Sequence, residues 1–372
     1  MKLKILTLLG TRPEIIRLSR IICELDKNFN HILVNSNQNF DTNLNKIFID
    51  TLKIRKPDYD LKCKNDNSIN FISKLVIEFD KVLIKEKPDA VLVLGDTNTG
   101  LAILAAKKRK IPIFHLEAGN RAYDMRVPEE INRKVIDHLS DVNLTYSEIA
   151  KNNLLRENFQ PDRVIKVGSP LYEVLNYYEV EIAQSNILEE LKIKKDNYFL
   201  LSSHREENLE DSKNFEIIVN TISYLNKKFK LPIIVTTHPR LRNKINKKII
   251  NKNSLIRFQK PFNYFEYVKL QKNAKLTLSD SGSIIEESNI LNFPAINFRT
   301  TTERQEGLEK GYCIMSGMNK VEIEQSIELM LNDKNGNIKN THSDYIAINL
   351  SKVVSKIIQS YVGYINKKVW LK

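Results

Sequence analysis

Short apolar runs rich in Val, Ile and Leu alternate along this chain with amphipathic stretches, and each run closes on Gly, Asp, Glu or Ser. In the first half the runs are KILTLLG, DAVLVLGD, IPIFHLE, VNLTYS and RVIKVGS, and helical patterns lie between them, as at residues 15–25 and 99–109. Strands buried in parallel sheets are continuously apolar, and helices connect them. The alternation therefore predicts βαβ units and a doubly wound parallel sheet.

The same pattern restarts after Gly168, in the runs YFLLSSHREEN, LPIIVTTHPR, SLIRFQK, AKLTLSDSGS and FPAINFRTTTER. At 372 residues the chain is long enough for two domains that each bury a core. We predict an α/β protein with Rossmann-like domains at residues 1–168 and 169–350, and a C-terminal segment, 351–372, whose helix packs back across the junction. The carboxyl ends of both sheets would then line a cleft.

The net charge of +13 comes from lysines scattered through a sequence that is also rich in Asn and Ile. It indicates either a generally basic surface or an anionic ligand such as a phosphate ester. The sequence has no basic helix and no interleaving of aromatic and basic residues, so we expect no nucleic-acid partner.

The cysteines and the N-terminal residues indicate the cellular compartment of the protein. Cys23, Cys63 and Cys313 are far apart and lack CxxC or histidine spacing, which is typical of reduced thiols rather than a disulfide framework or a zinc site. The first apolar run ends at Gly10 and continues into a charged loop, as a strand does and a signal peptide does not. No run approaches the ~20 apolar residues of a membrane span. We expect a cytoplasmic protein without a membrane partner.

A candidate phosphate site lies in SDSGSIIEES, which places Ser281, Gly282 and Ser283 at the start of a helix directly after a strand. Free backbone N–H groups and the helix dipole favour an anion there, although a serine-capped helix start without a ligand would have the same sequence. The loop TTTERQEG brings Arg304 to the same rim, and GTRPE offers Arg12 from the first domain. Together these residues predict a diphosphate clamp.

Carboxylates and histidines follow the predicted strands at other places. Asp96 in GDTNTG, Glu117 in HLEAG and Glu129 in VPEEINR lie at or just beyond strand ends of the first domain, so we expect them to converge on one pocket. For any one of them the alternative is a helix cap or a structural ion pair. His204, followed by Arg205, opens HREEN after a strand of the second domain and would face them.

Three further histidines, and the search for cofactor motifs, indicate no additional site. We interpret His115 and His238, at strand ends, as structural, and His138 as a surface residue one helical turn from Lys134. Metal-ligand spacing and a GxGxxG motif are both missing from the sequence, so no metal or nicotinamide cofactor is expected.

Motifs from residue 10 to about 307 resemble those of the non-hydrolysing UDP-N-acetylglucosamine 2-epimerases. They occur in the family's order: GTRPE, GDT, HLEAG with PEEINR, HRE, SDSG with EE, and TTER. The resemblance implies a glycosyltransferase-B-like pair of Rossmann-type domains, often a homodimer, that inverts carbon 2 of a UDP-linked N-acetyl amino sugar.

The resemblance also implies roles for individual residues. Active-site positions of the family match Arg12, Asp96, Glu117, Glu129, Arg133 and His204. Positions that hold the diphosphate and ribose match Ser281, Gly282, Ser283 and Glu287, and Arg304 matches a basic residue beside them. The family eliminates UDP from carbon 1 as the carbon 2 proton is lost, and adds it back to the glycal after protonation from the other face. Arg12, Arg205, Arg304 and the Ser281 helix start could hold the leaving diphosphate; which carboxylate serves which face stays open.

Two departures point to a narrower branch. This chain has Arg17 where members that act on UDP-N-acetylglucosamine usually have lysine, and Asn120 in EAGNR where they have EAGLR. The segments GTRPEIIRLSR, EAGNRAYDMRVPEEINRK, LTYSEIA and GSPLYEVL are similar to enzymes that convert UDP-2-acetamido-2,6-dideoxy-L-talose to UDP-N-acetyl-L-fucosamine for capsule and O-antigen. That branch more often has HERPEG where this chain has TTERQEG.

Other functions remain open at this stage. The alternatives within the family are UDP-N-acetylglucosamine 2-epimerase, which yields UDP-N-acetylmannosamine, and UDP-diacetamido-uronate 2-epimerase. Outside it, a glycosyltransferase of the same fold, a hydrolysing epimerase or a non-catalytic nucleotide-sugar sensor would share the clamp. Three carboxylates together argue against the sensor, which would not need them.

Overall fold

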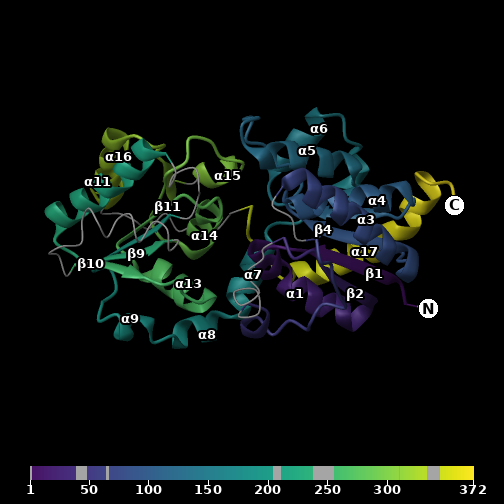
Figure 1. Cartoon of the computed structure of the whole chain (residues 1–372), viewed down its shortest axis with the longest axis horizontal. Coiled ribbons are helices and arrows are strands. Elements are labelled where there is room, and N and C mark those ends of the chain that lie inside the picture. The colour runs from purple at the N-terminus through teal and green to yellow at the C-terminus, as the bar shows by residue number, and fades with distance from the viewer. Residues whose placement is uncertain are drawn as a thin grey trace. The chain divides into compact units, whose positions relative to one another are not determined.

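The computed structural model describes residues 2–38, 48–63, 67–203, 211–237, 255–309, 311–332 and 344–372. It divides into two compact units, which we describe separately (Figure 1). Unit 1 comprises residues 1–177 and 344–372, and unit 2 comprises residues 178–343. Both are parallel α/β sheets, so the predicted fold class is confirmed.

Unit 1 is built on a seven-stranded parallel sheet with the order β3-β2-β1-β4-β5-β6-β7. The strands are β1 (Lys4–Leu9), β2 (Asn30–Asn35), β3 (Tyr59–Asp60), β4 (Ala90–Leu94), β5 (Ile113–Leu116), β6 (Val142–Thr145) and β7 (Val164–Lys166). The helices are α1 (Arg12–Asn28), α3 (Ser68–Glu86), α4 (Ile103–Lys108), α5 (Pro128–Leu139), α6 (Glu148–Arg156), α7 (Pro170–Tyr177) and α17 (Leu350–Lys368), with 3₁₀ turns η1 (Asn98–Ala102) and η2 (Pro161–Arg163).

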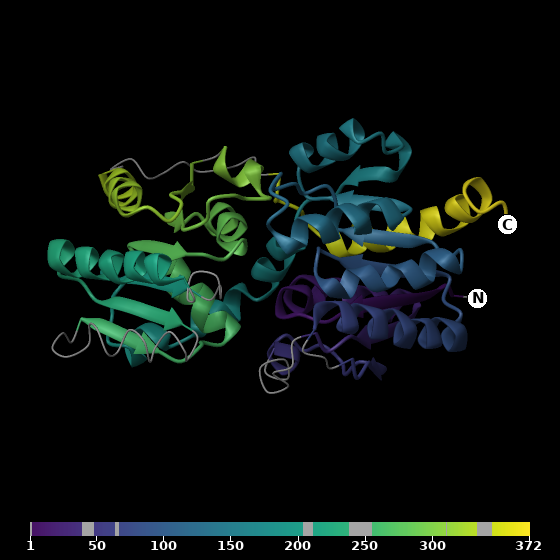
Figure 2. The ribbon, with the colours of Figure 1, turned by 45° about the horizontal axis from the view of Figure 1, so that its top comes forward.

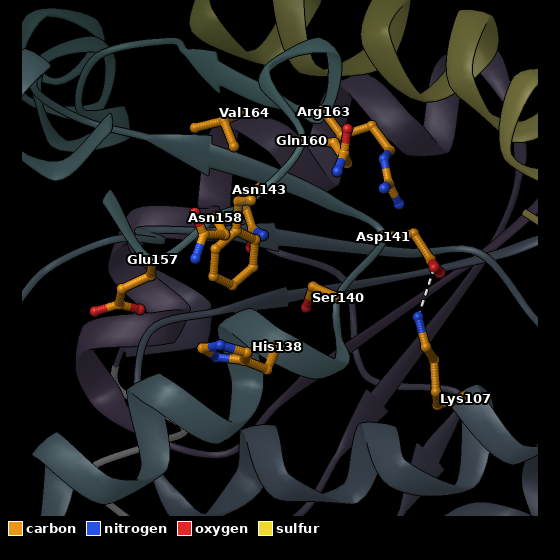
Figure 3. A pocket seen from close by; sticks show the side chains of 11 residues that line it. Lys107, His138, Ser140, Asp141, Asn143, Glu157, Asn158, Gln160, Arg163 and Val164 are labelled. Atoms are coloured by element: carbon orange, nitrogen blue, oxygen red, sulfur yellow. Dashed lines mark hydrogen bonds and ion pairs between the residues drawn. The ribbon is translucent and has the colours of Figure 1, made fainter. Parts of the chain in front are cut away.

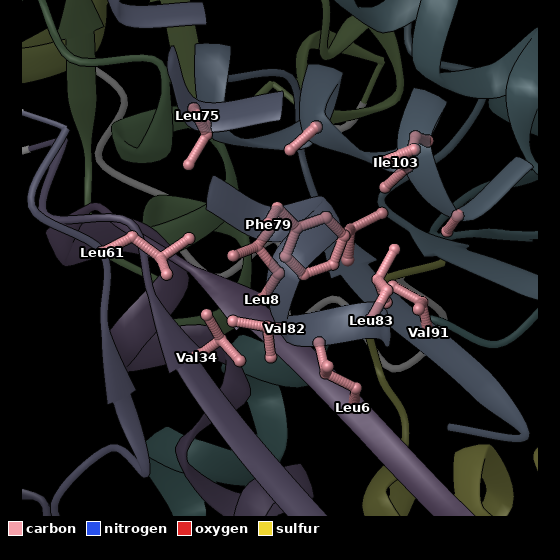
Figure 4. Packing of buried hydrophobic residues seen from close by; sticks show 14 of the residues in the cluster. Leu6, Leu8, Val34, Leu61, Leu75, Phe79, Val82, Leu83, Val91 and Ile103 are labelled. Atoms are coloured by element: carbon pink, nitrogen blue, oxygen red, sulfur yellow. The ribbon is translucent and has the colours of Figure 1, made fainter. Parts of the chain in front are cut away.

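The core of unit 1 forms where α3 packs on the sheet (Figure 4). Phe71, Leu75, Phe79 and Leu83 recur at every fourth position of α3, so all four face the sheet and are buried. They pack in one cluster with apolar side chains of β1 and β4, among them Leu8. Burial of each such side chain stabilises the unit by roughly 1.5–3 kcal/mol. This packing holds the strands in place, and with them the polar loops that follow their carboxyl ends.

Unit 2 repeats this plan with a six-stranded sheet in the order β10-β9-β8-β11-β12-β13, whose pairings are all parallel. Its strands are β8 (Phe199–Ser203), β9 (Ile233–Thr237), β10 (Ile256–Gln259), β11 (Leu276–Ser279), β12 (Ala295–Asn297) and β13 (Cys313–Met315). Its helices are α8 (Glu179–Gln184), α9 (Ile187–Glu190), α11 (Ser212–Phe229), α13 (Tyr264–Asn273), α14 (Ser283–Leu291), α15 (Gln305–Leu308) and α16 (Lys320–Asn332).

The strand order reverses once in each sheet, between β1 and β4 in unit 1 and between β8 and β11 in unit 2. In open parallel sheets the crevice at such a reversal, at the carboxyl ends of the strands, is where ligands bind. GTRPE follows β1 and GDT follows β4, while SDSG follows β11. The topology therefore brings these motifs to the reversal points of their own sheets.

The division between the units differs from the sequence boundary at residues 168 and 169. Helix α7 belongs to unit 1, because it packs on α1 and the Arg20 guanidinium lies 3.4 Å from the centre of the Tyr177 ring. The chain returns to unit 1 at residue 344 rather than 351. Helix α17 packs within unit 1 on α1 and α7 (Figure 2). Ser351 donates to the Glu173 carboxylate from its N–H (2.7 Å) and its hydroxyl (2.6 Å).

Two local expectations are refined. The stretch at residues 99–109, expected as one helix, begins as the 3₁₀ turn η1 and continues as α4. Gly100 lies so close to α5 that an added Cβ would come within 2.4 Å of Ile136 Cδ1, so glycine lets η1 pack against α5. Among the helices of the described ranges, none has both the length and the apolar composition needed to cross a bilayer.

Candidate active site

Asp96 and Glu117 emerge side by side at the carboxyl edge of the unit 1 sheet. Strands β4 and β5 pair in parallel with Leu94 opposite Leu116, so the loops that follow them start level with each other. Gly95 turns the first loop at φ +77°, and Glu117 itself adopts φ +73°, a conformation that non-glycine residues rarely adopt. Backbone strain of this kind is often found at functional sites.

Arg133 fastens helix α5 to the Asp96 loop. Its Nε and Nη2 donate to Asp96 Oδ2 at 3.0 and 2.6 Å, and its Nη1 donates to Glu130 Oε2 at 3.0 Å. Asn132 adds a bond from Nδ2 to the backbone oxygen of Asp96 at 3.0 Å. The guanidinium is almost fully buried, so one cation offsets the charge of two carboxylates in a place that excludes most water.

The two adjacent acids of VPEEINR have different environments. Glu130 is fully buried and accepts the N–H groups of Ala122 (2.9 Å) and Tyr123 (3.1 Å) in addition to Arg133. Glu129 is half-buried, in the first turn of α5, and makes no hydrogen bond or ion pair with any residue that the structure describes. Glu130 is thus a structural acid that the sequence interpretation missed, and Glu129 is the one that remains available to a ligand.

Arg17 lies against Glu117, and Asn120 follows Glu117 by three residues in the same loop. Arg17 on α1 is buried, and its Nε lies 3.7 Å from Glu117 Oε2. Asn120, in the turn after Glu117, is only 3% exposed, and neither its Oδ1 nor its Nδ2 has a hydrogen-bond partner among the described residues. An unmet buried amide costs about 1–3 kcal/mol, which a polar ligand at this point would recover.

Glu14, the acid of GTRPE, is a further buried group that the sequence interpretation did not single out. Its Oε2 accepts the N–H groups of Gly10 (2.6 Å) and Thr11 (3.0 Å), and its Oε1 accepts the Thr97 hydroxyl at 2.6 Å. Burial raises the pKa of Glu14 to about 7, although these three hydrogen bonds act in the other direction. Glu14 therefore ties the loop after β1, which carries Arg12, to the residue directly after Asp96. Arg12 itself is partly exposed and lies 5.6 Å from the centre of the Phe48 ring.

The carboxyl edge of the unit 2 sheet carries small hydroxyl side chains at a helix start. The Oγ atoms of Ser281 and Ser283 lie 2.9 Å apart, just before and at the first residue of α14. No side chain caps the helix at Gly282. An added Cβ at Gly282 would come within 2.7 Å of Glu303 Oε1 and 2.8 Å of Arg299 Nη1, so glycine lets the Arg299–Glu303 pair lie against the helix start.

Glu287 and Arg304 are both held by neighbours. Glu287 Oε2 accepts a bond from Gln271 Nε2 at 2.6 Å. Arg304 is 3% exposed, and its Nη1 lies 3.1 Å from Oε2 of the fully buried Glu286. The sequence predicted Arg304 as a basic residue of the clamp, but the pairing with Glu286 was not visible in it.

Some predicted residues lie outside the described ranges, namely His204, Arg205 and His238. A site shared by the two units likewise stays a prediction of the sequence. In the ranges that the structure covers, no three His, Cys, Asp or Glu side chains gather in a way that could hold a metal ion.

Two open hollows on unit 1 lie elsewhere. One, of about 290 Å³, is lined by residues at the amino ends of β6 and β7, including Asp141, which is paired with Lys107, and Val164 (Figure 3). The other, of about 350 Å³, lies between β3 and α3. None of Asp96, Glu117 and Glu129 lines either cavity. We assign the candidate site from the side chains at the strand ends and not from these hollows.

Comparison with known proteins identifies the family. Residues 22–359 match the family model described as UDP-N-acetylglucosamine 2-epimerase. The chain is 39% identical to the UDP-N-acetylglucosamine 2-epimerase of Methanocaldococcus jannaschii, over 89% of this chain and 93% of that protein.

Solved structures give the same result. A UDP-N-acetylglucosamine 2-epimerase structure from Rickettsia bellii matches with a TM-score of 0.92 at 45% identity, covering all of both chains. The M. jannaschii enzyme in complex with UDP-GlcNAc and UDP matches with a TM-score of 0.87 at 37% identity, covering 96% of this chain and 99% of that one. The chain, an isomerase with two parallel-sheet units, belongs to the UDP-N-acetylglucosamine 2-epimerase family.

Proposed function

We propose that this protein inverts carbon 2 of a UDP-linked 2-acetamido sugar without hydrolysing it, by eliminating UDP and adding it back. The observation that carries the proposal is the pair of carboxylates, Asp96 and Glu117, at the ends of adjacent strands, each with a guanidinium beside it. The family membership supports the same reaction.

The chemistry explains why such a pair is needed. The hydrogen on carbon 2 is not next to a carbonyl, so its removal alone leaves no stabilised anion. If the bond from carbon 1 to the UDP oxygen breaks as the proton leaves carbon 2, the electron pair forms the double bond of a glycal. Return of a proton to the opposite face of carbon 2, with addition of the UDP oxygen to carbon 1, completes the inversion. Two acid–base groups are therefore needed, one for each face.

We assign these steps to unit 1. Asp96, Glu117 and Glu129 supply the two acid–base groups and one orienting partner, and Arg133 holds Asp96 in place. Each positioned general acid or base contributes about 10²- to 10⁴-fold in rate. His204 joins this group on the resemblance alone.

We assign the departing diphosphate mainly to unit 2. The start of α14 offers the hydroxyls of Ser281 and Ser283 and the backbone of Gly282, and Glu287 would hold the ribose. Arg304, with Arg12 and Arg205, would offset the charge of the leaving group. A preorganised donor of this kind is worth about 3 kcal/mol when charge develops on the leaving oxygen.

For the sugar we propose UDP-2-acetamido-2,6-dideoxy-L-talose, with UDP-N-acetyl-L-fucosamine, a precursor for capsule or O-antigen, as the product. The buried amide of Asn120 and the Arg17–Glu117 pair support this, because they replace the leucine and lysine expected for a D-gluco substrate. A second candidate is UDP-N-acetylglucosamine, favoured by the M. jannaschii structure that contains UDP-GlcNAc and UDP.

A comparison of substrates tests both levels of the proposal. The purified protein is incubated with each UDP-sugar, and the products are identified by NMR. We expect a mixture of the two carbon 2 epimers, still linked to UDP, with the 6-deoxy-L-talo sugar turned over much faster. Free sugar plus UDP would indicate a hydrolysing enzyme, and UDP release only with an added acceptor would indicate a glycosyltransferase. Equal rates on the two sugars would contradict the narrower substrate and leave the epimerase reaction intact.

We further propose a homodimer, which exposed apolar side chains of unit 1 support. Helix α3 exposes Ile69 (71%) and Ile77 (58%), and α5 exposes Ile131 (50%). Helix α4 packs against both α3 and α5, so the three helices form one continuous layer. Sedimentation analysis should give twice the mass of the chain, and Ile77→Asp should lower it; a monomeric wild-type protein would contradict the proposal.

A further inference from the structure

A buried charge network lies beneath the loops that carry Asp96 and Glu117. Its members are three fully buried residues, His115 on β5, Arg121 in the loop after β5 and Asp137 on α5, together with Glu157 at the end of α6. Arg121 donates to Glu157 from Nε (2.7 Å) and Nη2 (2.6 Å), and from Nη1 to Asp137 Oδ2 (2.7 Å). Neither the proposed reaction nor the sequence motifs require these contacts.

The contacts of His115 fix where its hydrogens lie. Its Nε2 lies 2.8 Å from the carbonyl oxygen of Gly95, which can only accept, so Nε2 carries a hydrogen. Its Nδ1 lies 2.8 Å from Asp137 Oδ1. Asp137 also accepts the Gly119 N–H (3.2 Å to Oδ2) and Arg121, as an ionised carboxylate does.

The charge of Asp137 agrees with this placement. Burial acts to raise the pKa of Asp137, but the hydrogen bond and charge of His115, together with Arg121, outweigh it and hold the pKa below its usual value. Asp137 is thus an ionised carboxylate to which His115, Gly119 and Arg121 are all joined.

The network holds the backbone on both sides of the proposed acid–base groups. Gly95, which accepts from His115, directly precedes Asp96. Gly119, which donates to Asp137, follows Glu117 by two residues, and Arg121 Nη1 also donates to the carbonyl of Asn120 at 2.7 Å. Asp137 thus connects the loops after β4 and β5 to one helix.

We propose that Asp137 is a positioning residue for carbon 2 epimerisation: through His115, Gly119 and Arg121 it sets the separation of Asp96 and Glu117. The inference rests on the proposed function. Proton transfer to and from opposite faces of one carbon needs both carboxylates in register at once, and a misplacement of about 1 Å can cost 10²-fold in rate. Among the described residues, Asp137 makes no hydrogen bond with Asp96 or Glu117. It therefore acts on them only through the residues that it does bind.

Asp141 offers a matched control. It too is a buried aspartate at the junction of α5 and the sheet, and it accepts from Lys107 Nζ (2.6 Å) and from the N–H of Ile113 (3.0 Å) (Figure 3). These contacts lie at the amino end of β5, whereas those of Asp137 lie at its carboxyl end. The two aspartates therefore match in burial and in ionic pairing but differ in the end of the strand that they hold.

The experiment compares Asp137→Asn with Asp141→Asn. Both should lower stability, because each removes a buried carboxylate that pairs with a cation, Arg121 in the case of Asp137 and Lys107 in the case of Asp141. We expect Asp137→Asn to lower kcat about 10²-fold with UDP affinity unchanged, and Asp141→Asn to leave kcat near that of the wild type. Equal losses of kcat in the two variants, or an unchanged kcat in Asp137→Asn, would overturn the proposal.

Arg121→Lys decides the matter if Asp137→Asn does not fold. It keeps the positive charge but loses the two-pronged contact, so kcat should fall about tenfold at constant UDP affinity; an unchanged kcat would overturn the proposal. A wild-type protein that inverts no UDP-sugar would instead overturn the proposed function.

Discussion

The two sheets have similar strand topology, but their carboxyl edges carry different polar groups. At the edge of unit 1, Asp96 and Glu117 stand in a setting of buried guanidinium groups. At the edge of unit 2, the helix start with Ser281 and Ser283 offers hydroxyls and backbone N–H groups, and the carboxylates of Glu303 and Glu286 are paired with Arg299 and Arg304. Unit 1 is equipped to exchange protons with a ligand, and unit 2 is equipped to hold an anion.

Under the proposed function, the difference lets one architecture serve two halves of one reaction. Both edges lie where the strand order reverses, so topology provides a binding crevice in each unit. Which part of the substrate each crevice serves depends on whether acids or donors follow the strands. Substitutions at the two edges should therefore affect turnover and UDP binding separately.

The largest effect is expected for Glu117→Gln. The amide keeps the size of the side chain but neither accepts nor returns a proton, so kcat should fall by about 10³- to 10⁴-fold. UDP affinity, measured by calorimetry, should stay near that of the wild type, because the diphosphate is assigned to unit 2. A variant that binds UDP weakly but keeps its turnover would mean that the roles of the two edges are exchanged.

Arg304→Ala should affect unit 2 in two ways. It leaves Glu286 buried without its cation, which should destabilise the unit by about 3 kcal/mol, and it should weaken UDP binding. The double variant Arg304→Met/Glu286→Leu removes both charges and should recover the stability, measured by chemical denaturation, but not the UDP affinity. Recovery of both would show that Arg304 has only a structural role.

Glu14 gives unit 1 a pH dependence. Its pKa is about 7 in the folded protein against an ordinary value of 4.5, so the folded state keeps a proton that the unfolded chain releases. The contribution is fully present below about pH 4.5 and is lost as the pH rises through about 7, by up to about 3 kcal/mol. Denaturation midpoints of Glu14→Gln, which keeps its hydrogens at every pH, should lack this decline; parallel pH profiles would contradict the assignment.

Gly282→Ala should have the smallest effect and should confine it to unit 2. The added methyl would meet the ends of the Glu303 and Arg299 side chains, which are flexible, so stability should change little. Displacement of that pair from the helix start should weaken UDP binding about tenfold, or about 1.4 kcal/mol, with kcat at saturation unchanged. The control is Gly363→Ala, because an added Cβ at Gly363 meets nothing within 4 Å.

The sequence predicted the fold because its signals are local. Five apolar runs in each half correspond to strands, and the spacing at residues 15–25 predicted α1. Strands β2, β3 and β13 were not among these runs, and β3 has only two residues. The assignment of α7 to unit 1 could not be predicted, since it depends on which surface the helix packs against.

The sequence indicates where the candidate residues lie better than it indicates how they pair. Parallel strands bring their ends to one edge, so the proximity of Asp96 and Glu117 followed from the strand pattern. The choice between Glu129 and Glu130 depends on the rotational phase of α5, which is set by packing. The partnership of Arg304 with Glu286 and of His115 with Asp137 joins residues on different elements, and neither leaves a trace in sequence spacing.

Solvent exchange at carbon 2 tests the central claim most directly. The protein is incubated in deuterated water with the UDP-sugar that it epimerises, and deuterium at carbon 2 is followed by NMR and mass spectrometry. Because the proton is removed and returned by side chains that equilibrate with water, both epimers should gain deuterium at carbon 2, with traces of UDP and the glycal. Inversion of carbon 2 with full retention of the original hydrogen would contradict elimination and with it the roles assigned to Asp96 and Glu117.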